Sequence, residues 1–536
     1  LGQNMVGFAR LAVSGPAGTT VTLRFAEVLI PDGTIYTTSL RSARCTDQYT
    51  LSGNGPETYE PRFTFHGFRY VEITGFPGKP SLDAITGVVL HSDYRSTGAF
   101  ACSNAMLNQL QGNIVWGQKG NFLDVPTDCP QRDERLGWTG DIQVFCRTAC
   151  FNGDVAGFLT KWLVDLTDAQ SPKGAFPMVA PNLLRHAFPE HSDGGPAWAD
   201  AGVICPWTLY LCYGDTRVLE RNYDAMLRYM AYLDKTDYRT RHCFGDWLNI
   251  DDPTPKDLIG PAFHAYDAQL MAKIAHVLGH RRDAAKFAAR AKRLRAEFNE
   301  EFVTPTGRLA GGSQTAHVLA LHFDLLPPPR RTQAAERLVQ RVNEFKDHLS
   351  TGFVGTPYLL HVLTRFGHLD LAYKLLLNED FPSWGYPIKH GNATTMWERW
   401  DGWRHDKGFQ DPAMNSFNHY AYGAVGDWIY QNILGIELDE SRPGYEHFFV
   451  RPVPGGGLTW ARGEYQSVRG MIGSEWKIED GRFLLQVTVP GQTQATIALP
   501  GRRGKSVRVG PGTHRLETKW DTAARPVTRT ARPVSV

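Results

Sequence analysis

The pattern of hydrophobic and polar positions divides the chain into three parts, of which the first is β-rich. Over residues 1–97, apolar and polar residues alternate in short runs such as 19–30, 68–76 and 83–93, with turn residues between the runs. Successive side chains of a strand point to opposite faces of a sheet, so this alternation indicates half-buried strands. Several short strands with regular turns predict an N-terminal β-sandwich domain over residues 1–97, which we expect to be incomplete at its start.

The second part has the period of α-helices. Met106, Leu107, Leu110 and Ile114 recur at intervals of three and four, which is typical of an amphipathic helix. About twelve such segments, mostly paired by short turns, lie between residues 98 and 436, enough to close an (α/α)6 barrel with loops that line a cleft. The predicted helices begin near residue 102, after residue 140 and at residue 155, and continue near 198–213, 216–234, 262–280, 282–302, 315–324, 331–345, 355–366, 369–377 and 416–432.

The third part returns to alternation. Residues 437–520 contain short alternating runs separated by Pro-Gly and glycine-rich turns, which predict a C-terminal β-sandwich domain. Residues 521–536 have no periodicity and are predicted to form a tail. The whole pattern predicts a multidomain α+β protein with a central (α/α)6 barrel flanked by two β-sandwich domains.

Charge and composition narrow the classes of partner. The chain has 57 basic and 55 acidic residues, which argues against a nucleic-acid partner. No apolar run approaches the length of a membrane span, so we expect no membrane association. None of the eight cysteines forms a CxxC pair, so we expect no metal site, and Cys146 and Cys150 lie on an apolar helical pattern as core thiols. Unpaired cysteines and the lack of a signal peptide favour a cytoplasmic location.

A cluster of charges interrupts the helical part at residues 124–141, DVPTDCPQRDERLGWTGD. Asp128 and Arg132 are four residues apart, and Glu134, Trp138 and Asp141 would share one face if the segment were helical. An indole and a second carboxylate next to Glu134 would favour its protonated form, which a general acid needs at neutral pH. The alternative is a surface salt-bridge ladder, although prolines, glycines and tryptophan are unusual in a solvated helical face.

A second candidate carboxylate lies in residues 392–403, NATTMWERWDGW. Glu398 stands between Trp397 and Trp400, and a carboxylate is unfavourable to bury between two indoles unless it has partners or a function. A glycosidase usually needs a second carboxylate besides its acid, which makes Glu398 the candidate. The alternative is a pairing of Glu398 with Arg399 or Arg404 at the rim.

Three further residues are candidates for sugar binding. Trp198 lies in GGPAWADAGV and Trp247 in FGDWLNIDD, each at a junction between predicted helices. Core packing is the commoner role of tryptophan, but an indole also stacks on the C–H face of a pyranose. His419, in SFNHY, follows the Glu398 segment and is either a structural residue or a hydrogen-bonding partner of the sugar or the base.

These motifs, in this order, resemble the α-L-rhamnosidases of glycoside hydrolase family 78. DCPQRDERLGWTGD looks like the signature loop of that family, and the resemblance extends over nearly the whole chain. The other similar segments are FTFHGFRYVEI, PAWADAGV, GDWL, TGFVGTPYLL, PSWGYPI, TTMWERWDGW and SFNHY. The resemblance implies an (α/α)6 catalytic barrel with flanking β-sandwiches, and inversion at the anomeric carbon. Longer members have additional β domains upstream.

The resemblance also implies the roles of individual residues. Glu134 would be the general acid and Glu398 the general base of an inverting hydrolase that acts on terminal α-L-rhamnose. The positions that match rhamnose-binding residues of the family are Asp128, Arg132, Trp138, Asp141, Trp198, Trp247 and His419. The expected partners are rhamnose-containing glycosides or oligosaccharides, and no cofactor is expected. The alternatives are a non-catalytic rhamnose-binding protein and another (α/α)6-barrel glycosidase or phosphorylase.

Overall fold

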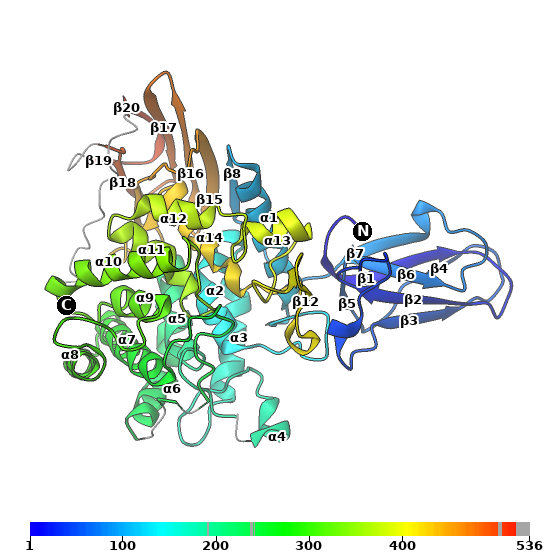
Figure 1. The fold of residues 1–536 in the computed structure, drawn as a ribbon, viewed down its shortest axis with the longest axis horizontal. Coiled ribbons are helices and arrows are strands. Elements are labelled where there is room, and N and C mark those ends of the chain that lie inside the picture. The colour runs from blue at the N-terminus through cyan, green and yellow to red at the C-terminus, as the bar shows by residue number, and fades with distance from the viewer. Residues whose placement is uncertain (190–191, 236–238, 241, 502–505, 521–536) are drawn as a thin grey trace. The chain divides into compact units, whose positions relative to one another are not determined.

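The structure is a computed structural model that describes residues 1–189, 192–235, 239–240, 242–501 and 506–520. The predicted tail, 521–536, lies outside the described residues. The chain is an α+β protein, as predicted, with β-strands at its start, helices in its middle and β-strands again near its end (Figure 1). It forms two compact units: unit 1 comprises Leu1–Asp93, Gly112–Gly137 and Pro387–Tyr420, and unit 2 comprises Tyr94–Gln111, Trp138–Tyr386 and Ala421–Val536.

Unit 1 is built on two antiparallel sheets. In one sheet β1 pairs with β4, β5 and β7, and in the other β2 lies between β3 and β6. The strands are β1 (Met5–Val13), β2 (Thr20–Ala26), β3 (Thr46–Thr50), β4 (Glu57–Tyr59), β5 (His66–Phe68), β6 (Tyr70–Thr74) and β7 (Ile85–Val89). The alternating runs of the sequence therefore form strands where they were predicted.

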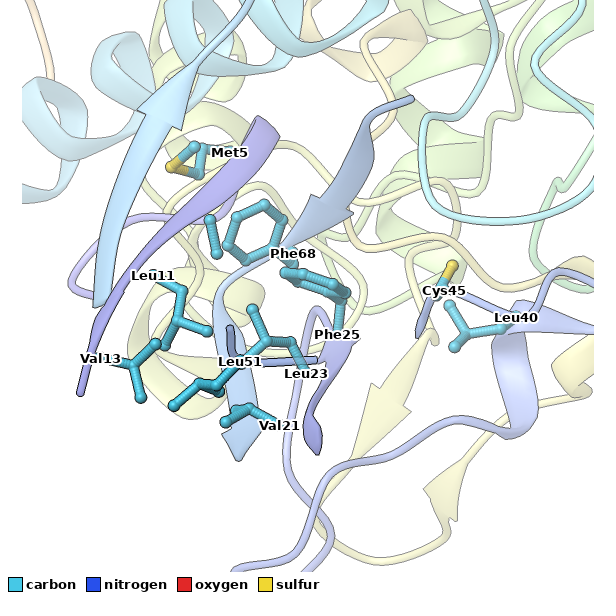
Figure 2. Packing of buried hydrophobic residues seen from close by; sticks show 11 residues of the cluster. Met5, Leu11, Val13, Val21, Leu23, Phe25, Leu40, Cys45, Leu51 and Phe68 are labelled. Atoms are coloured by element: carbon cyan, nitrogen blue, oxygen red, sulfur yellow. The ribbon is translucent and has the colours of Figure 1, made fainter. Parts of the chain in front are cut away.

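Both sheets of unit 1 contribute to one hydrophobic core. Leu11 and Val13 enter it from β1, and Leu23 and Phe25 enter it from β2, in each strand two residues apart (Figure 2). This is the period that places side chains on one face of a strand. Phe68 of β5 completes the contact, with its ring centroid 4.8 Å from that of Phe25.

Unit 2 contains most of the helices, and many pack as neighbours in the chain. Helix α5 packs against α6, α7 against α8, and α9 against α10 (Figure 1). The main helices after residue 138 are α2 (Thr139–Asn152), α3 (Ala156–Asp168), α5 (Ala201–Tyr213), α6 (Arg217–Lys235), α7 (Lys256–Val277), α8 (Arg281–Phe302), α9 (Gln314–His322), α10 (Pro328–Glu344), α11 (Thr356–Arg365) and α12 (Leu369–Leu376). These helices confirm the segments predicted from the helical period.

Other parts of the helical prediction need correction. The short helices α4 (Leu184–Ala187) and α13 (Gly385–Gly391) were not predicted, and α7 begins at Lys256 rather than at 262. The helix predicted at 416–432 is wrong over 416–420, and the chain becomes helical only at η5 (Ala421–Ala424), followed by α14 (Val425–Trp428) and a π-helix, η6 (Ile429–Ile433).

The irregular backbone at 416–420 is explained by the side chains that bind its backbone N–H groups. The Ser416 hydroxyl oxygen accepts a hydrogen bond from the Asn418 N–H at 3.2 Å, and the Phe417 N–H donates to a side chain distant in sequence. Such side-chain partners satisfy backbone groups that a helix would otherwise pair internally.

The strands of unit 2 form two sheets. One has the order β20-β17-β16-β15-β8, and the other β13-β14-β18-β19. The strands are β8 (Gly98–Cys102), β13 (Ile436–Leu438), β14 (His447–Val450), β15 (Trp460–Ser467), β16 (Gly470–Glu479), β17 (Arg482–Val489), β18 (Gln494–Ala498), β19 (Ser506–Val509) and β20 (Gly512–Lys519). Strand β8 therefore pairs with a strand more than three hundred residues later, Ala461 lying opposite Cys102.

Two further sequence predictions concern cysteines and membrane association. All eight cysteines are buried and free, which confirms Cys146 and Cys150 as core thiols. Within the described part of the chain, no helix combines the length and the apolar character required to cross a membrane.

Candidate functional site

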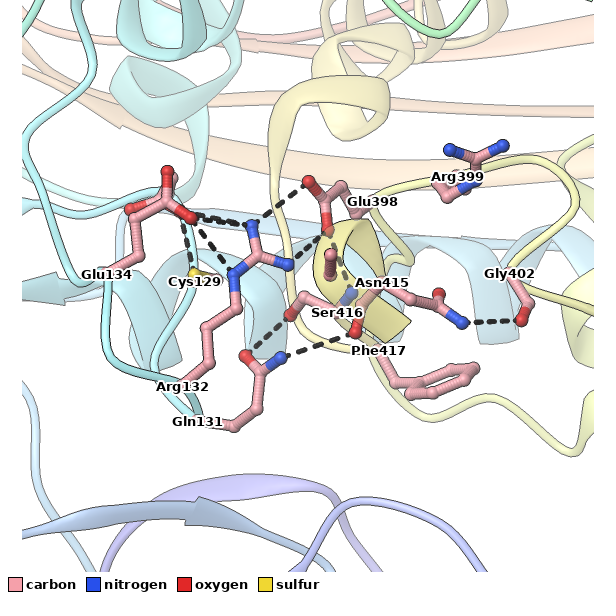
Figure 3. Close-up of polar contacts among 12 residues, drawn as sticks. Cys129, Gln131, Arg132, Glu134, Glu398, Arg399, Gly402, Asn415, Ser416 and Phe417 are labelled. Carbon is pink, nitrogen blue, oxygen red and sulfur yellow. Dashed lines mark hydrogen bonds and ion pairs between the residues drawn. The ribbon is translucent and has the colours of Figure 1, made fainter. Parts of the chain in front are cut away.

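Two carboxylates from distant segments of unit 1 converge on one arginine. Arg132 donates from Nε to Glu134 Oε2 at 3.0 Å, and from Nη1 and Nη2 to Glu398 at 2.9 and 3.2 Å (Figure 3). Glu398 lies 266 residues after Arg132 in the sequence. Asp128 Oδ2 lies 3.7 Å from Arg132 Nη2. We call Asp128, Arg132, Glu134 and Glu398 the carboxylate cluster.

Burial excludes the alternative interpretations of these charges. The side chain of Arg132 is 1% exposed and that of Glu398 is 3% exposed, so neither belongs to a solvated surface ladder. Arg399 and Arg404 pair with other acids, Asp401 and Asp406. The pairing of Glu398 with a rim arginine is therefore wrong, and its partner is the arginine of the signature loop.

The charges of the cluster stabilise one another. Burial alone would raise the pKa of Glu398, but the charges of Arg132 and His419 and the hydrogen bonds from Arg132 and Ser416 lower it below its ordinary value. Burial likewise opposes the charge of Arg132, and the neighbouring carboxylates raise its pKa nonetheless. Glu398 is therefore a carboxylate near neutral pH, as a general base must be.

The backbone around Glu398 explains how it is held. The N–H of Glu398 donates to the Ser416 carbonyl at 2.9 Å, and the N–H of His419 donates to the Met396 carbonyl at 2.8 Å. The Ser416 N–H in turn donates to Glu398 Oε2 at 2.8 Å. Ser416 also donates its hydroxyl to Gln131 Oε1 at 2.9 Å, so the signature loop and the Glu398 segment are linked a second time (Figure 3).

The signature loop is not helical, which corrects the prediction of a shared helical face. Residues 134–137 have no regular structure, Arg135 has φ of 52°, and α2 begins only at Thr139. The loop is stabilised instead by Asp128, whose Oδ1 accepts from the Leu136 N–H at 2.9 Å and whose backbone N–H donates to the Leu136 carbonyl at 3.0 Å. Glu134 therefore does not share a helical face with Trp138 and Asp141, and its side chain contacts Arg132 instead (Figure 3).

Arg41 is a contact of Glu134 that the sequence analysis missed. Its Nη2 donates to Glu134 Oε2 at 3.2 Å and its Nε donates to Asp133 Oδ1 at 2.6 Å. Arg41 follows η1 (Thr38–Leu40) in the N-terminal β region, and nothing in its sequence neighbourhood distinguishes it from Arg44. Only the fold reveals this contact.

Strand β5 also supports the signature loop. A Cβ built on Gly67 would lie 2.9 Å from a Pro130 side-chain atom and 3.0 Å from the Gln131 nitrogen, so only glycine permits this approach. Cys45 Sγ donates to the Gln131 carbonyl at 3.2 Å. The FHGF motif of the sequence therefore has a packing role behind the loop.

Two carboxylates of the cluster and the adjacent Cys129 form a set of atoms that could ligate a metal. Ligand atoms of Asp128, Cys129 and Glu134 lie within 4.8 Å of one another. However, the Cys129 thiol donates to Asp128 Oδ2 at 2.7 Å, and burial raises the pKa of this thiol well above its ordinary value. The guanidinium of Arg132 also contacts both carboxylates. A thiol that keeps its proton and an adjacent fixed cation make this set a poor site for a metal ion.

Unit 2 contains the three tryptophans that the sequence singled out, and all three surround one phenylalanine. The Phe244 ring centroid lies 5.9 Å from that of Trp138, 5.1 Å from that of Trp198 and 5.4 Å from that of Trp247. Phe244 was not predicted as a site residue. We call these four residues the aromatic cluster. Trp198 is buried, whereas Trp138, Phe244 and Trp247 retain partial exposure.

Small residues and one carboxylate fix Trp198. A Cβ built on Gly140 would lie 2.5 Å from the indole of Trp198, which explains the glycine after Trp138 and Thr139. Ala197 has φ of 67°, and its N–H donates to Asp200 Oδ2 at 2.6 Å. Asp200 also accepts from the Tyr229 hydroxyl at 2.8 Å. Burial raises the pKa of Asp200 despite these hydrogen bonds.

A second buried carboxylate fixes the loop of Trp247. Asp246 accepts hydrogen bonds from the Thr315 hydroxyl at 2.5 Å and from the backbone N–H groups of Gly352, Val354 and Gly355 at 2.8, 2.9 and 3.1 Å. A Cβ on Gly352 would lie 2.0 Å from the Trp247 carbonyl, so this approach also requires glycine. The GDWL and TGFVGT motifs of the sequence therefore contact each other directly.

The remaining predicted residues lie one in each unit. His419 is 3% exposed, beside Tyr420 in unit 1, and its charge acts on Glu398. Asp141 is 3% exposed and lies in the first turn of α2 in unit 2. The structure thus brings Asp128, Arg132, Glu134 and Glu398 together in unit 1, with His419 near them, and brings the three tryptophans together in unit 2.

Comparison with known families and proteins gives consistent matches. Three family profiles match the chain: the bacterial alpha-L-rhamnosidase concanavalin-like domain over residues 1–91, the bacterial alpha-L-rhamnosidase 6 hairpin glycosidase domain over residues 95–433, and the bacterial alpha-L-rhamnosidase C-terminal domain over residues 435–514.

The chain is also similar to curated proteins and a solved structure. It is 52% identical over 516 residues to an alpha-L-rhamnosidase of Streptomyces avermitilis, covering 96% of this chain and 49% of that protein. It is 43% identical over 523 residues to an alpha-L-rhamnosidase of Formosa agariphila, covering 95% and 56%. The crystal structure of Streptomyces avermitilis alpha-L-rhamnosidase complexed with L-rhamnose matches with a TM-score of 0.93 and 51% identity, over 97% of this chain and 51% of that one. The chain spans about half the length of the curated relatives it matches.

Proposed function

Because the chain belongs to the bacterial α-L-rhamnosidase family, we propose that it hydrolyses terminal, non-reducing α-L-rhamnose from rhamnosides. The observation that carries the proposal is the convergence of Glu134 and Glu398 on the buried Arg132. Glycoside hydrolysis uses a pair of carboxyl groups that flank the scissile bond. A non-catalytic sugar-binding protein has no need of such a pair.

In this proposal Glu134 is the general acid and Glu398 is the general base. Glu134 gives its proton to the glycosidic oxygen as the bond from that oxygen to the anomeric carbon breaks. Glu398 takes a proton from the water that attacks the opposite face of the sugar, so the product is the β anomer. The lowered pKa of Glu398 supports the role of base. Arg132 orients both carboxylates, and Asp128 and Asp141 add negative charge that favours an oxocarbenium-like transition state.

We propose that the remaining predicted residues bind the sugar. Rhamnose has a methyl group in place of the C6 hydroxymethyl, so its subsite needs an apolar wall, and the partly exposed ring of Trp138 is the candidate. Trp198, Trp247 and His419 complete the proposed set. One methyl group contributes only about 1–3 kcal/mol of discrimination, so hydroxyl contacts to charged residues carry most of the specificity.

We also propose the domain division for this function. Residues 98–436 would form the catalytic (α/α)6 barrel, and residues 1–97 and 437–520 would form the flanking β-sandwich domains. The pairing of consecutive helices in unit 2 and the two sheets of unit 1 support this division.

The test is hydrolysis of a chromogenic α-L-rhamnoside, first in buffer without phosphate and then with phosphate added. Release of the aglycone without phosphate is the expected result, whereas release that depends on phosphate would indicate a phosphorylase. Binding of L-rhamnose without release would indicate a sugar-binding protein. Proton NMR of the first product distinguishes inversion from retention. The β anomer is expected, and initial formation of the α anomer would contradict the assignment of Glu398 as a base.

A further inference from the structure

A buried carboxylate of the N-terminal β region lies behind the proposed general base. Resting on the proposed function, we propose that Glu27 is a positioning residue for Glu398, through which the first 93 residues of the chain act on the catalytic step. Glu27 directly follows β2 and is 2% exposed, in the same compact unit as Glu398. None of the sequence motifs discussed above includes it.

The contacts of Glu27 lead directly to the segment that holds the base. Glu27 Oε2 accepts from the Phe417 N–H at 3.0 Å, and Glu27 Oε1 accepts from Asn4 Nδ2 at 3.0 Å. Asn4 Nδ2 also lies 3.2 Å from Thr395 Oγ1 and 3.3 Å from the Phe417 carbonyl. Thr395 donates its hydroxyl to the same carbonyl at 2.6 Å. Asn4 and Glu27 therefore contact the Glu398 segment at Thr395 and the neighbouring chain at Phe417.

Two consecutive backbone N–H groups are shared between the two carboxylates. The Ser416 N–H donates to Glu398 Oε2 and the Phe417 N–H donates to Glu27 Oε2. The two peptides meet at the Cα of Ser416, where φ and ψ remain rotatable, so the Phe417 contact restricts the Ser416 N–H by holding the chain next to it. Glu27 thus holds the segment whose backbone N–H orients the base. A small displacement of a catalytic group can reduce the rate strongly, so the contact bears on the reaction rather than on the fold alone.

The charge of Glu27 can change near neutral pH. Burial raises its pKa to about 7, although the hydrogen bonds from Asn4 and Phe417 and the charge of Arg132 act in the opposite direction. The titratable and charged groups that act on it or respond to it are Arg132, Glu398 and Cys45. Its side chain can accept the Phe417 hydrogen bond in either protonation state, since one carboxyl oxygen remains an acceptor when the other carries the proton.

The experiment compares Glu27→Gln with Glu27→Asp. Glutamine keeps the length and one acceptor oxygen for the Phe417 N–H but loses the acceptor of the Asn4 hydrogen bond. Aspartate keeps the charge but is one methylene too short to reach the Phe417 N–H. We expect E27Q to retain kcat on an α-L-rhamnoside within about threefold, and E27D to lose on the order of tenfold in kcat with KM nearly unchanged. The matched controls are Glu72→Gln and Glu72→Asp on β6 of the same unit, which should leave both constants unchanged.

A second readout does not require activity. In the difference between the infrared spectra of the wild type and E27Q, a band of a protonated carboxyl should be present below pH 7 and should disappear as pH rises through about 7. If E27D keeps the kcat of the wild type while E27Q loses it, Glu27 acts through its charge and the positioning role is overturned. An inactive wild type would instead contradict the proposed function, and the infrared titration would still report whether Glu27 is the buried acid described above.

Discussion

The two clusters contain similar numbers of predicted residues, but ion pairs stabilise the first and ring contacts stabilise the second. The carboxylate cluster of unit 1 is built from charges whose partners lie up to 266 residues apart, and its central arginine is almost completely buried. The aromatic cluster of unit 2 is built from rings around Phe244. An unpaired buried charge is strongly destabilising, whereas a lost ring contact is a modest loss. On the proposed function, we expect the carboxylate cluster to act on the chemical step and the aromatic cluster to act on sugar binding.

Removing either proposed catalytic carboxylate should have the largest effect on rate. Glu398→Gln should reduce kcat about 10²–10⁴-fold for all rhamnosides, because water is no longer activated. Glu134→Gln should do the same for poor leaving groups but less for aryl rhamnosides, whose leaving oxygen needs less protonation. Steady-state kinetics on both substrate types tests this. Equal losses on both types with Glu134→Gln would contradict its role as the acid, and Glu220→Gln on the surface of α6 is the control.

Removing the central arginine should have the largest effect on stability. Arg132→Met leaves Glu134 and Glu398 without their common partner, and breaking a buried pair in this way is destabilising by about 3–5 kcal/mol. Chemical denaturation followed by circular dichroism measures the change. Arg10→Met, which removes the exposed Arg10–Glu60 pair, is the control and should change stability by about 0–1 kcal/mol. Equal changes for the two variants would show that the carboxylate cluster does not depend on Arg132.

Disrupting the aromatic cluster should affect binding more than chemistry. Phe244→Leu weakens three ring contacts of about 0.5–1.5 kcal/mol each, so we expect KM to rise by about tenfold while kcat changes little. Phe483→Leu, which removes a ring contact with Trp476 in the C-terminal sheet, should lower stability without changing KM. A fall in kcat with unchanged KM for Phe244→Leu would contradict the division of roles between the clusters.

The smallest effect is expected in the pH profile. Because the pKa of Glu398 is lowered, the base loses activity only as pH falls through a value below the ordinary range of glutamate. His419→Asn removes one of the charges that lower this pKa, so the acid limb of kcat/KM should move to higher pH. The exposed His186→Asn should leave it in place. An acid limb that does not move, or that moves to lower pH, would show that His419 does not act on the base.

The sequence predicted the elements of this fold better than their ends or the backbone of the site. Period-two and helical patterns depend on which side chains are buried, and they located the strands of unit 1 and most helices of unit 2. They failed at 416–420, because Ser416 and Phe417 satisfy their backbone groups with partners outside any local pattern. They also failed at the signature loop, where Asp128 forms two local bonds to Leu136 and Arg135 takes a left-handed conformation.

The site residues also divide into those that a local sequence pattern reveals and those that only the tertiary fold reveals. Glu134, Glu398 and the tryptophans stand out because charged and aromatic residues share one short segment with prolines and glycines. Arg41 and Glu27 do not stand out, because each lies at an ordinary helix or strand end and gains its role from a contact far away in sequence. Phe244 lies in the FGDWLNIDD stretch, but its contact with Trp198 cannot be read from that stretch. The positions of such residues are a property of the tertiary fold, and no local window contains the information.

The contact of Asp246 has a consequence for the order of folding. Its carboxylate binds backbone groups as far as 109 residues later in the chain, so the loop that carries Trp247 cannot settle until that long stretch has closed. Closing a large loop costs conformational entropy of the chain, which opposes such a contact. Contacts between residues so far apart in sequence slow folding. The loop of Trp247 should therefore become ordered late, after the helices between the two segments have already formed.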